Sequence, residues 1–490
     1  MRKAFEGQRR LDSAAVHRVQ LNPNCRDEIV PVLRALQHLY GQPQVRDAIL
    51  RKVAADVNPD SSNQHGRPGI DYWSIVVLAG VRLGCNLDYD KLQDLAEQHR
   101  ALRQIMGIGD WEDEEPLDWR RIRDNLTLLY PETIEEISHA IVAEGHKLVP
   151  EAIETVRADS FVAETNIHYP TESSLIRDGL RKILSLCATL TVLVRTGGWR
   201  QHQHLYRKAK RLARQIDRIA ARKGHGYQQR LKKLYRELLG LADRVVSPAE
   251  ELCKCVQKRV KADYEVLALE GEIQVFLERT RHVCNTARRR VLQGETVANS
   301  EKIFSIFETH TQLYMRGKPA EPVQFGRQIL VYEDGTGFVT HAYLLPRDKD
   351  DHDVVVEQTR KLQARLGGRI RRASFDRGFH SPENQEELAK IVEHLCVPMP
   401  GPQQAARQEA EATVAFRQAR ERHPGIESAI NALETGNGLG RCRDRTERGF
   451  SRYLQLAVLG RNLHVLGKIL LERDDPRCLA ARSNRKPIAA

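Results

Sequence analysis

The sequence lacks a long uninterrupted apolar segment. Its longest apolar stretch, residues 183–194, is interrupted by Ser and Thr and falls well short of the roughly 20 residues that a membrane-spanning helix needs. The N-terminus is basic, but neither an apolar core nor a small-residue cleavage site follows, so we expect no signal peptide. These absences disfavour a membrane partner and predict a cytoplasmic protein.

Paired cysteines are also lacking. The nine cysteines of the 490 residues are scattered and odd in number, a pattern typical of reduced thiols in the cytoplasm. The one close pair, Cys253 and Cys255, has no second Cys or His pair at the spacing of a zinc site. A structural zinc site is therefore disfavoured.

Acidic residues are outnumbered by basic ones. The chain has 77 Lys and Arg against 65 Asp and Glu, which gives a formal charge of +12, and such a surplus attracts polyanions such as DNA. The shortage is most pronounced in residues 195–236, where Asp217 is the only acid. A solvated helix face is the alternative, but such faces normally mix both signs. We therefore predict phosphate contacts by the basic side chains of this stretch, above all Arg207, Lys208, Lys210, Arg211 and Arg214.

The apolar periodicity changes along the chain. It is helical up to about residue 150, strand-like at residues 153–162, and helical again over residues 172–315, with breaks near residues 197–198 and 224–226 and near Pro248 and Gly271. A strand hairpin at residues 328–345 is followed by helix, strand, helix, strand and a helical end. This order predicts an α/β core with a mixed sheet, an all-α N-terminal domain, and a large all-α insertion after the first core strand.

The expected domain boundaries follow from these changes of pattern. They define a helical N-terminal domain, the first part of the core, the helical insertion, the remainder of the core, and a basic tail, at residues 1–150, 151–174, 175–318, 319–470 and 471–490.

Three acidic residues stand where phosphodiester chemistry would need them. Asp159 lies inside an otherwise apolar strand, Asp376 ends the strand predicted at residues 369–375, and Glu427 lies in the first turn of a helix. Each has an ordinary explanation as an edge-strand, turn or helix-dipole residue. Together they match a site with two divalent cations about 3.5–4 Å apart, which stabilise the attacking and leaving oxygens of a phosphodiester. Carboxylate oxygens are the ligands that Mg²⁺ prefers.

A further acidic cluster precedes the helix predicted at residues 354–366. It contains Asp348, Asp350, Asp351 and Asp353. We expect Asp353 or Asp351 to cap this helix, and a metal-binding role is the less favoured interpretation.

The segments around the three carboxylates resemble the DDE transposases of bacterial insertion sequences, most closely the ISNCY-like branch. The similar segments are VRADS at 156–160 with ETNIHYPTES at 164–173, FDRGF at 375–379, and GIESAINALE at 425–434 with GL at 438–439 and RNL at 461–463. The segment GRPG at 66–69 and the helices after it resemble the helical domain of the same transposases, which implies that the N-terminal domain, residues 1–150, binds DNA. The resemblance covers roughly residues 60–175 and 320–470.

The resemblance implies an RNase H-like core in which Asp159, Asp376 and Glu427 are catalytic and hold two Mg²⁺ or Mn²⁺ ions. In such a core we expect the strand of Asp159 to pair in parallel with that of Asp376, and the hairpin of residues 328–345 to continue the sheet on the other side of the first strand. It also implies binding of transposon-end and target DNA as a homodimer or larger assembly, in the bacterial cytoplasm and associated with the nucleoid. Several other branches carry a DNA-contacting Lys where this chain has Glu434. We expect Arg441, Arg443 or Arg445 to supply that contact instead.

Three other functions fit parts of the sequence. A nuclease of the same fold would cut DNA without joining it, and a domesticated DNA-binding protein would have no activity. A basic helical scaffold for RNA would not need the three carboxylates in their order. The presence of all three carboxylates favours the transposase.

Overall fold

The computed structural model describes residues 11–58, 69–111, 117–259, 263–315, 322–399 and 411–474. The GRPG segment up to residue 68 and the basic tail from residue 475 lie outside these ranges. The chain divides into two compact units, one formed by residues 1–164 and 327–490 and the other by residues 165–326. We call them the sheet unit and the helical unit.

A seven-stranded mixed sheet organises the fold. Its strands are β1 (Thr155–Thr165), β2 (Gln312–Met315), β3 (Val323–Asp334), β4 (Val339–Leu344), β5 (Arg372–Phe375), β6 (His394–Cys396) and β7 (Arg441–Cys442). The order is β2-β3-β1-β5-β6, with β4 paired to β3 and β7 to β1. Strands β1, β5 and β6 run parallel, whereas β2, β3 and β4 run antiparallel. These pairings confirm an α/β architecture with a mixed sheet.

The pairing of β1 with β5 joins two strands that are more than 200 residues apart in the sequence. It is parallel, with Ala158 opposite Phe375 as the last pair, and β3 neighbours β1 on the other side. Both features were predicted from the sequence. Strands β2 and β7 were not predicted, because each is short and is defined only by its pairing to a neighbour.

Helices cover both faces of the sheet. On one face α12 (Asp351–Arg365) and α13 (Pro382–Ala389) bury apolar side chains against residues of β1, β3 and β5. On the other face lie α7 (Pro131–Leu148), α16 (Gly425–Asn431) and α17 (Glu447–Asp474), which share a second core with the alternate residues of β1 and β3. Helix α15 (Val414–Arg422) packs against β5 and β6.

The N-terminal helices join this second core. They are α1 (Ile29–Tyr40), α2 (Pro43–Val57), α3 (Tyr72–Gly84), α4 (Tyr89–Gln98), α5 (Arg100–Ile105) and α6 (Trp119–Leu126). Helices α1, α3 and α7 pack directly on α17. The fully buried Asn462 of α17 accepts a hydrogen bond from the Val339 amide and donates to Ser138 and to the Val339 carbonyl. The C-terminal helix therefore holds the N-terminal helices to the sheet.

Helix α17 is long and apolar enough to cross a membrane by length and composition alone, and 72% of its most apolar window is buried within the protein. Core helices of soluble proteins pass the same test.

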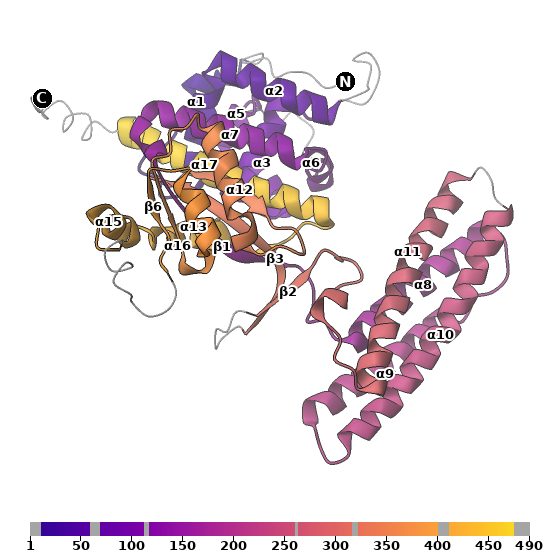
Figure 1. The fold of residues 1–490 in the computed structure, drawn as a ribbon. Helices are drawn as coiled ribbons and strands as arrows, with labels where there is room; N and C mark the ends of the chain where they lie inside the picture. Colours follow the sequence, from indigo (N-terminus) through magenta and orange to yellow (C-terminus); the bar gives the residue numbers. More distant parts are fainter. Residues whose placement is uncertain are drawn as a thin grey trace, which may run out of the picture. The chain divides into compact units, whose positions relative to one another are not determined.

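The helical unit contains α8 (Glu172–Leu193), α9 (His202–Arg222), α10 (Tyr227–Arg259) and α11 (Tyr264–Ala287), which lie side by side around a core of their own (Figure 1). The predicted breaks at Pro248 and Gly271 are wrong, because α10 and α11 run through them. Buried residues on both sides of each position, such as Val246 and Ala249 around Pro248, hold the helices together despite the local cost. The helical prediction up to residue 315 also extends too far, since α11 is followed by a π-helical turn, Arg288–Gln293, and then by β2.

Short helical turns complete the structure. They are 3-10 turns at Val16–Arg18, Pro150–Glu154, Asn299–Glu301 and Arg377–Phe379, and a second π-helical turn at Ala432–Gly436.

Candidate active site

Asp159 and Asp376 follow directly after the last paired residues of two adjacent parallel strands. Ala158 and Phe375 are the last opposed pair of β1 and β5; Asp159 is the next residue of β1, and Asp376 directly follows the end of β5. Asp159 is half-buried and Asp376 is exposed. The backbone therefore brings these two predicted site residues to the same end of β5, as parallel pairing requires.

The two aspartates also share a face of the sheet. Side chains alternate along a strand, and Val156, Ala158 and Phe375 belong to the core beneath α12. Asp159 and Asp376 are therefore expected to point toward the opposite face. Helix α16 covers that face, because its Ile426 belongs to the core on that side.

Glu427 lies on the first turn of α16. Its neighbour Ile426 is buried, whereas Glu427 itself is exposed. The buried side of this short helix is thus packed into the sheet unit, and the carboxylate of Glu427 is accessible. The backbone places Glu427 on the face from which the two aspartates are expected to emerge.

His423 connects the start of α16 to β5. Its Nδ1 lies 3.1 Å from the Oγ of Ser374, which is two residues before Asp376. Burial lowers the pKa of His423, while the negative charges of Asp376 and Glu427 act in the opposite direction. Carboxylates from β5 and from α16 are therefore both within electrostatic reach of one imidazole. No local pattern could indicate this role of His423, because Ser374 is 49 residues away in the sequence.

The chemistry of the three carboxylates fits a hard divalent cation. As the side chains lie, however, the described ranges contain no group of three or more His, Cys, Asp or Glu residues that could hold a metal ion. Like charges repel one another when no cation lies between them. The roles of Asp159, Asp376 and Glu427 as metal ligands therefore stay a prediction, supported by the positions of the backbone.

The acidic cluster before α12 has a structural role. Asp350, and not Asp353 or Asp351 as predicted, is the N-cap, and Asp353 completes its capping box. Asp351 accepts a hydrogen bond of 2.6 Å from Ser160. Ser160 alternates with Asp159 along β1, so this contact lies toward the opposite face from the candidate site.

Helix α9 in the helical unit carries the predicted basic surface. Its buried side is formed by Ala209, Leu212, Ala213 and Ile216. The exposed arginines recur at helical spacing on the other side, at positions 207, 211, 214, 218 and 222. We call these five residues the arginine stripe.

The five basic residues predicted on α9 differ in exposure. Arg207, Arg211 and Arg214 are exposed, whereas Lys208 and Lys210 are half-buried. Within the described part of the chain, none of them forms an ion pair with an acidic side chain. Tyr206 packs against the core of the unit.

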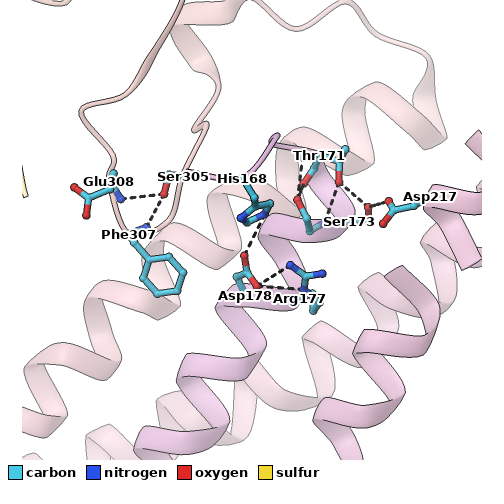
Figure 2. Close-up of polar contacts among 10 residues, drawn as sticks. His168, Thr171, Ser173, Arg177, Asp178, Asp217, Ser305, Phe307 and Glu308 are labelled. Atoms are coloured by element: carbon cyan, nitrogen blue, oxygen red, sulfur yellow. Dashed lines mark hydrogen bonds and ion pairs between the residues drawn. The ribbon is translucent and has the colours of Figure 1, made fainter. Parts of the chain in front are cut away.

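Asp217, the acid of α9, is held by a residue of α8 (Figure 2). Ser173 donates a hydrogen bond of 2.8 Å to Asp217, and Thr171 caps the same helix with Ser174. His168 and Arg177 both contact Asp178. The segment at 164–173 therefore stabilises the start of the helical bundle, and its Ser173 engages Asp217, the only acid of residues 195–236.

Two of the remaining DNA-binding candidates differ from each other. Arg441 is exposed on β7. Arg443 is half-buried, and its guanidinium donates to Tyr453 at 2.9 Å and to Asn86 at 2.6 Å. These contacts hold a loop of the N-terminal helices to α17, so Arg443 is already engaged inside the sheet unit.

Comparisons of the chain with protein families, with characterised proteins and with solved structures gave no match.

Proposed function

We propose that this protein is a DDE transposase, which cuts DNA at the ends of an insertion sequence and joins those ends to a target. One observation carries the proposal. In the parallel register of β1 and β5, Asp159 within β1 and Asp376 directly after β5 each follow the opposed pair Ala158–Phe375, on the face that α16 covers with Glu427.

The order of the strands supports an RNase H-like core. In such a core the first strand pairs with the strand of the second aspartate, and an antiparallel hairpin continues the sheet on the other side. Strands β3 and β4 form that hairpin next to β1. The helical unit begins at the end of β1 and returns to the sheet through β3, which fits an insertion after the first core strand.

Asp159, Asp376 and Glu427 would hold Mg²⁺ or Mn²⁺ in this proposal. When bound, such ions stabilise charge on the attacking and leaving oxygens of a phosphodiester. The protein's own contribution is to keep three carboxylates on rigid elements, one within a strand, one directly after a strand and one on a packed helix. Carboxylates held in this way orient both the ions and the scissile phosphate.

DNA binding is assigned to the arginine stripe of α9. Exposed guanidinium groups that have no acidic partner are free to contact phosphates, and such contacts do not depend on base sequence. Arg441 is a further candidate, since it is exposed on β7 and β7 pairs with the strand that carries Asp159. Assembly as a homodimer or larger complex on DNA belongs to the same proposal.

Strand cleavage tests the assignment. Supercoiled DNA that carries candidate end sequences is incubated with the protein and Mg²⁺ or Mn²⁺, and the nicks are mapped. Asp159→Ala, Asp376→Ala and Glu427→Ala should each abolish nicking and leave the fold intact, because each removes a ligand of a shared cluster. Glu383→Ala is a matched control, since Glu383 is also an exposed glutamate in the first turn of a helix. Nicking by any of the three variants at the rate of this control would remove that residue from the site.

A DNA-binding protein without catalytic activity is the second candidate. It is favoured by one observation, namely that the described residues hold no ready group of metal ligands. This candidate predicts salt-dependent DNA binding by α9 and no nicking at any Mn²⁺ concentration. A nuclease that cuts without joining would nick DNA but give no strand-transfer product.

A further inference from the structure

Arg157 lies on β1 two residues before Asp159 and makes contacts on two sides. Its Nε donates to Oε2 of Glu333 on β3 at 2.6 Å, and its Nη2 lies 2.5 Å from the same oxygen. Its Nη1 donates at 3.0 Å to the carbonyl of Arg422, the last residue of α15. One guanidinium therefore connects two neighbouring strands to the chain that leads into α16.

The ion pair of Arg157 is well enclosed. The side chain of Glu333 is 3% exposed and that of Arg157 is 26% exposed. Arg461 of α17 adds a second, longer contact of 3.8 Å to Glu333. A buried carboxylate held by a forked guanidinium has a well-defined geometry. The contact with Glu333 of β3 therefore fixes the position of Arg157.

Gly425, the first residue of α16, lies directly over this guanidinium. A Cβ at position 425 would lie 2.1 Å from Nη1 of Arg157 and 2.6 Å from its Cζ. Only glycine leaves room for the guanidinium to reach the carbonyl of Arg422. This close approach sets the distance between β1 and the first turn of α16. Glu427 lies on that turn.

Two residues of the sheet, Arg157 and Ser374, thus hold the start of α16, and we call them the anchors. They occupy equivalent positions in their strands. Arg157 stands two residues before Asp159, and Ser374, which contacts His423, stands two residues before Asp376. Residues two apart on a strand share a face. The anchors therefore rise from the same face as the two aspartates and hold the segment at 422–425, which precedes Glu427.

We propose that Arg157 is a positioning residue that sets the place of Glu427 relative to Asp159 and Asp376. Position 425 is glycine because a larger residue would displace the guanidinium of Arg157. The proposal rests on the proposed function, because it assigns Glu427 to a metal site. Arg157 and Gly425 themselves do not touch the reacting atoms. Groups that orient metal ligands typically change metal affinity by about 10–100-fold when they are replaced.

The test is Mn²⁺ binding to the full-length protein without DNA, measured by titration calorimetry. Gly425→Ala forces the guanidinium away and should weaken Mn²⁺ binding at least about tenfold. Gly436→Ala is the matched control, because Gly436 ends the helical run that begins at Gly425, and a Cβ there meets nothing within 4 Å. The control should bind Mn²⁺ within about twofold of the wild type, since it changes no ligand or anchor.

A second variant keeps the proposal testable if Gly425→Ala unfolds. Arg157→Lys keeps the charge beside Glu333, but a single ammonium cannot replace the fork that reaches both partners. It should also weaken Mn²⁺ binding, while circular dichroism stays that of the wild type. Equal Mn²⁺ affinity in Gly425→Ala, Arg157→Lys and Gly436→Ala would overturn the positioning role alone. A wild-type protein that does not bind Mn²⁺ would overturn the proposed metal site and, with it, the positioning role.

Discussion

The arginine stripe gives the most quantitative prediction about DNA binding. The triple variant Arg207→Ala, Arg211→Ala and Arg214→Ala removes three exposed cations from α9. Alanine is the strongest helix former, and the buried side of α9 is unchanged, so the helical bundle should stay folded. Any change in DNA affinity then reports the lost charges.

The expected size follows from counterion release. Each phosphate contact contributes about 0.9 to the slope of log K against log salt concentration, so three lost contacts reduce the slope by about 2.7. Between about 50 and 200 mM salt, the ratio of wild-type to variant affinity should therefore shrink by about 40-fold. Fluorescence anisotropy of a labelled duplex over this salt range measures both quantities.

A control with the same charge change separates specific contacts from net charge. Lys254, Arg281 and Arg288 lie in the same unit, and each already has an acidic partner, Glu251, Glu250 and Asp243 respectively. Their triple alanine variant should change the slope much less than the variant of the stripe. Equal slopes for the two triple variants would refute the assignment of α9 as the phosphate-binding surface.

Three further predictions concern the stability of the sheet unit, measured by urea unfolding. Asp334→Ala should lower the free energy of unfolding by about 3–5 kcal/mol. The reason is that the fully buried Asp334 pairs with His146 at 2.7 Å and also accepts hydrogen bonds from the backbone of its turn. A loss below about 1 kcal/mol, on the order of one ordinary hydrogen bond, would contradict this. Gly467→Ala should cost about 1–3 kcal/mol or more, since its Cβ would lie 1.8 Å from the carbonyl oxygen of Pro31; unchanged stability would mean that α1 and α17 do not pack as described. Burial lowers the pKa of His341 to about 4. Its contribution to the free energy of unfolding is therefore fully present above pH 6.5, the unfolded pKa, and is lost as the pH falls toward about 4. His341→Gln should flatten this pH dependence, and an equally steep profile would contradict it.

Local patterns in the sequence were enough to find the strands that carry the candidate site. The alternating residues around Asp159 and the strand before Asp376 predicted β1 and β5, and their parallel pairing is confirmed. An acid inside an otherwise apolar strand, and an acid directly after such a strand, give a clear local signal. The roles of the acids themselves remain predictions.

Contacts between distant segments could not be predicted in the same way. Arg157 and Glu333 are 176 residues apart, and Arg157 and Arg422 are 265 apart, so no local preference links them. The same holds for Asn462, which was noticed as part of a motif but whose partners on α7 and β4 appear only in the folded chain.

The wrong helix breaks have a related cause. Pro248 and Gly271 weaken a helix locally, and the sequence alone gave no measure of the packing that offsets this. In the structure, Val246, Ala249 and Ile273 are buried in the core of the helical unit. Tertiary packing outweighs the local cost of each residue.

The central claim is that Asp159, Asp376 and Glu427 bind the catalytic metal ions, and the positions of Mn²⁺ test it most directly. Crystals grown with Mn²⁺ give anomalous difference peaks that locate the ions without reference to activity. The account predicts two peaks about 3.5–4 Å apart, bounded by carboxylate oxygens of these three residues. Peaks elsewhere in the sheet unit, or none at saturating Mn²⁺, would contradict it.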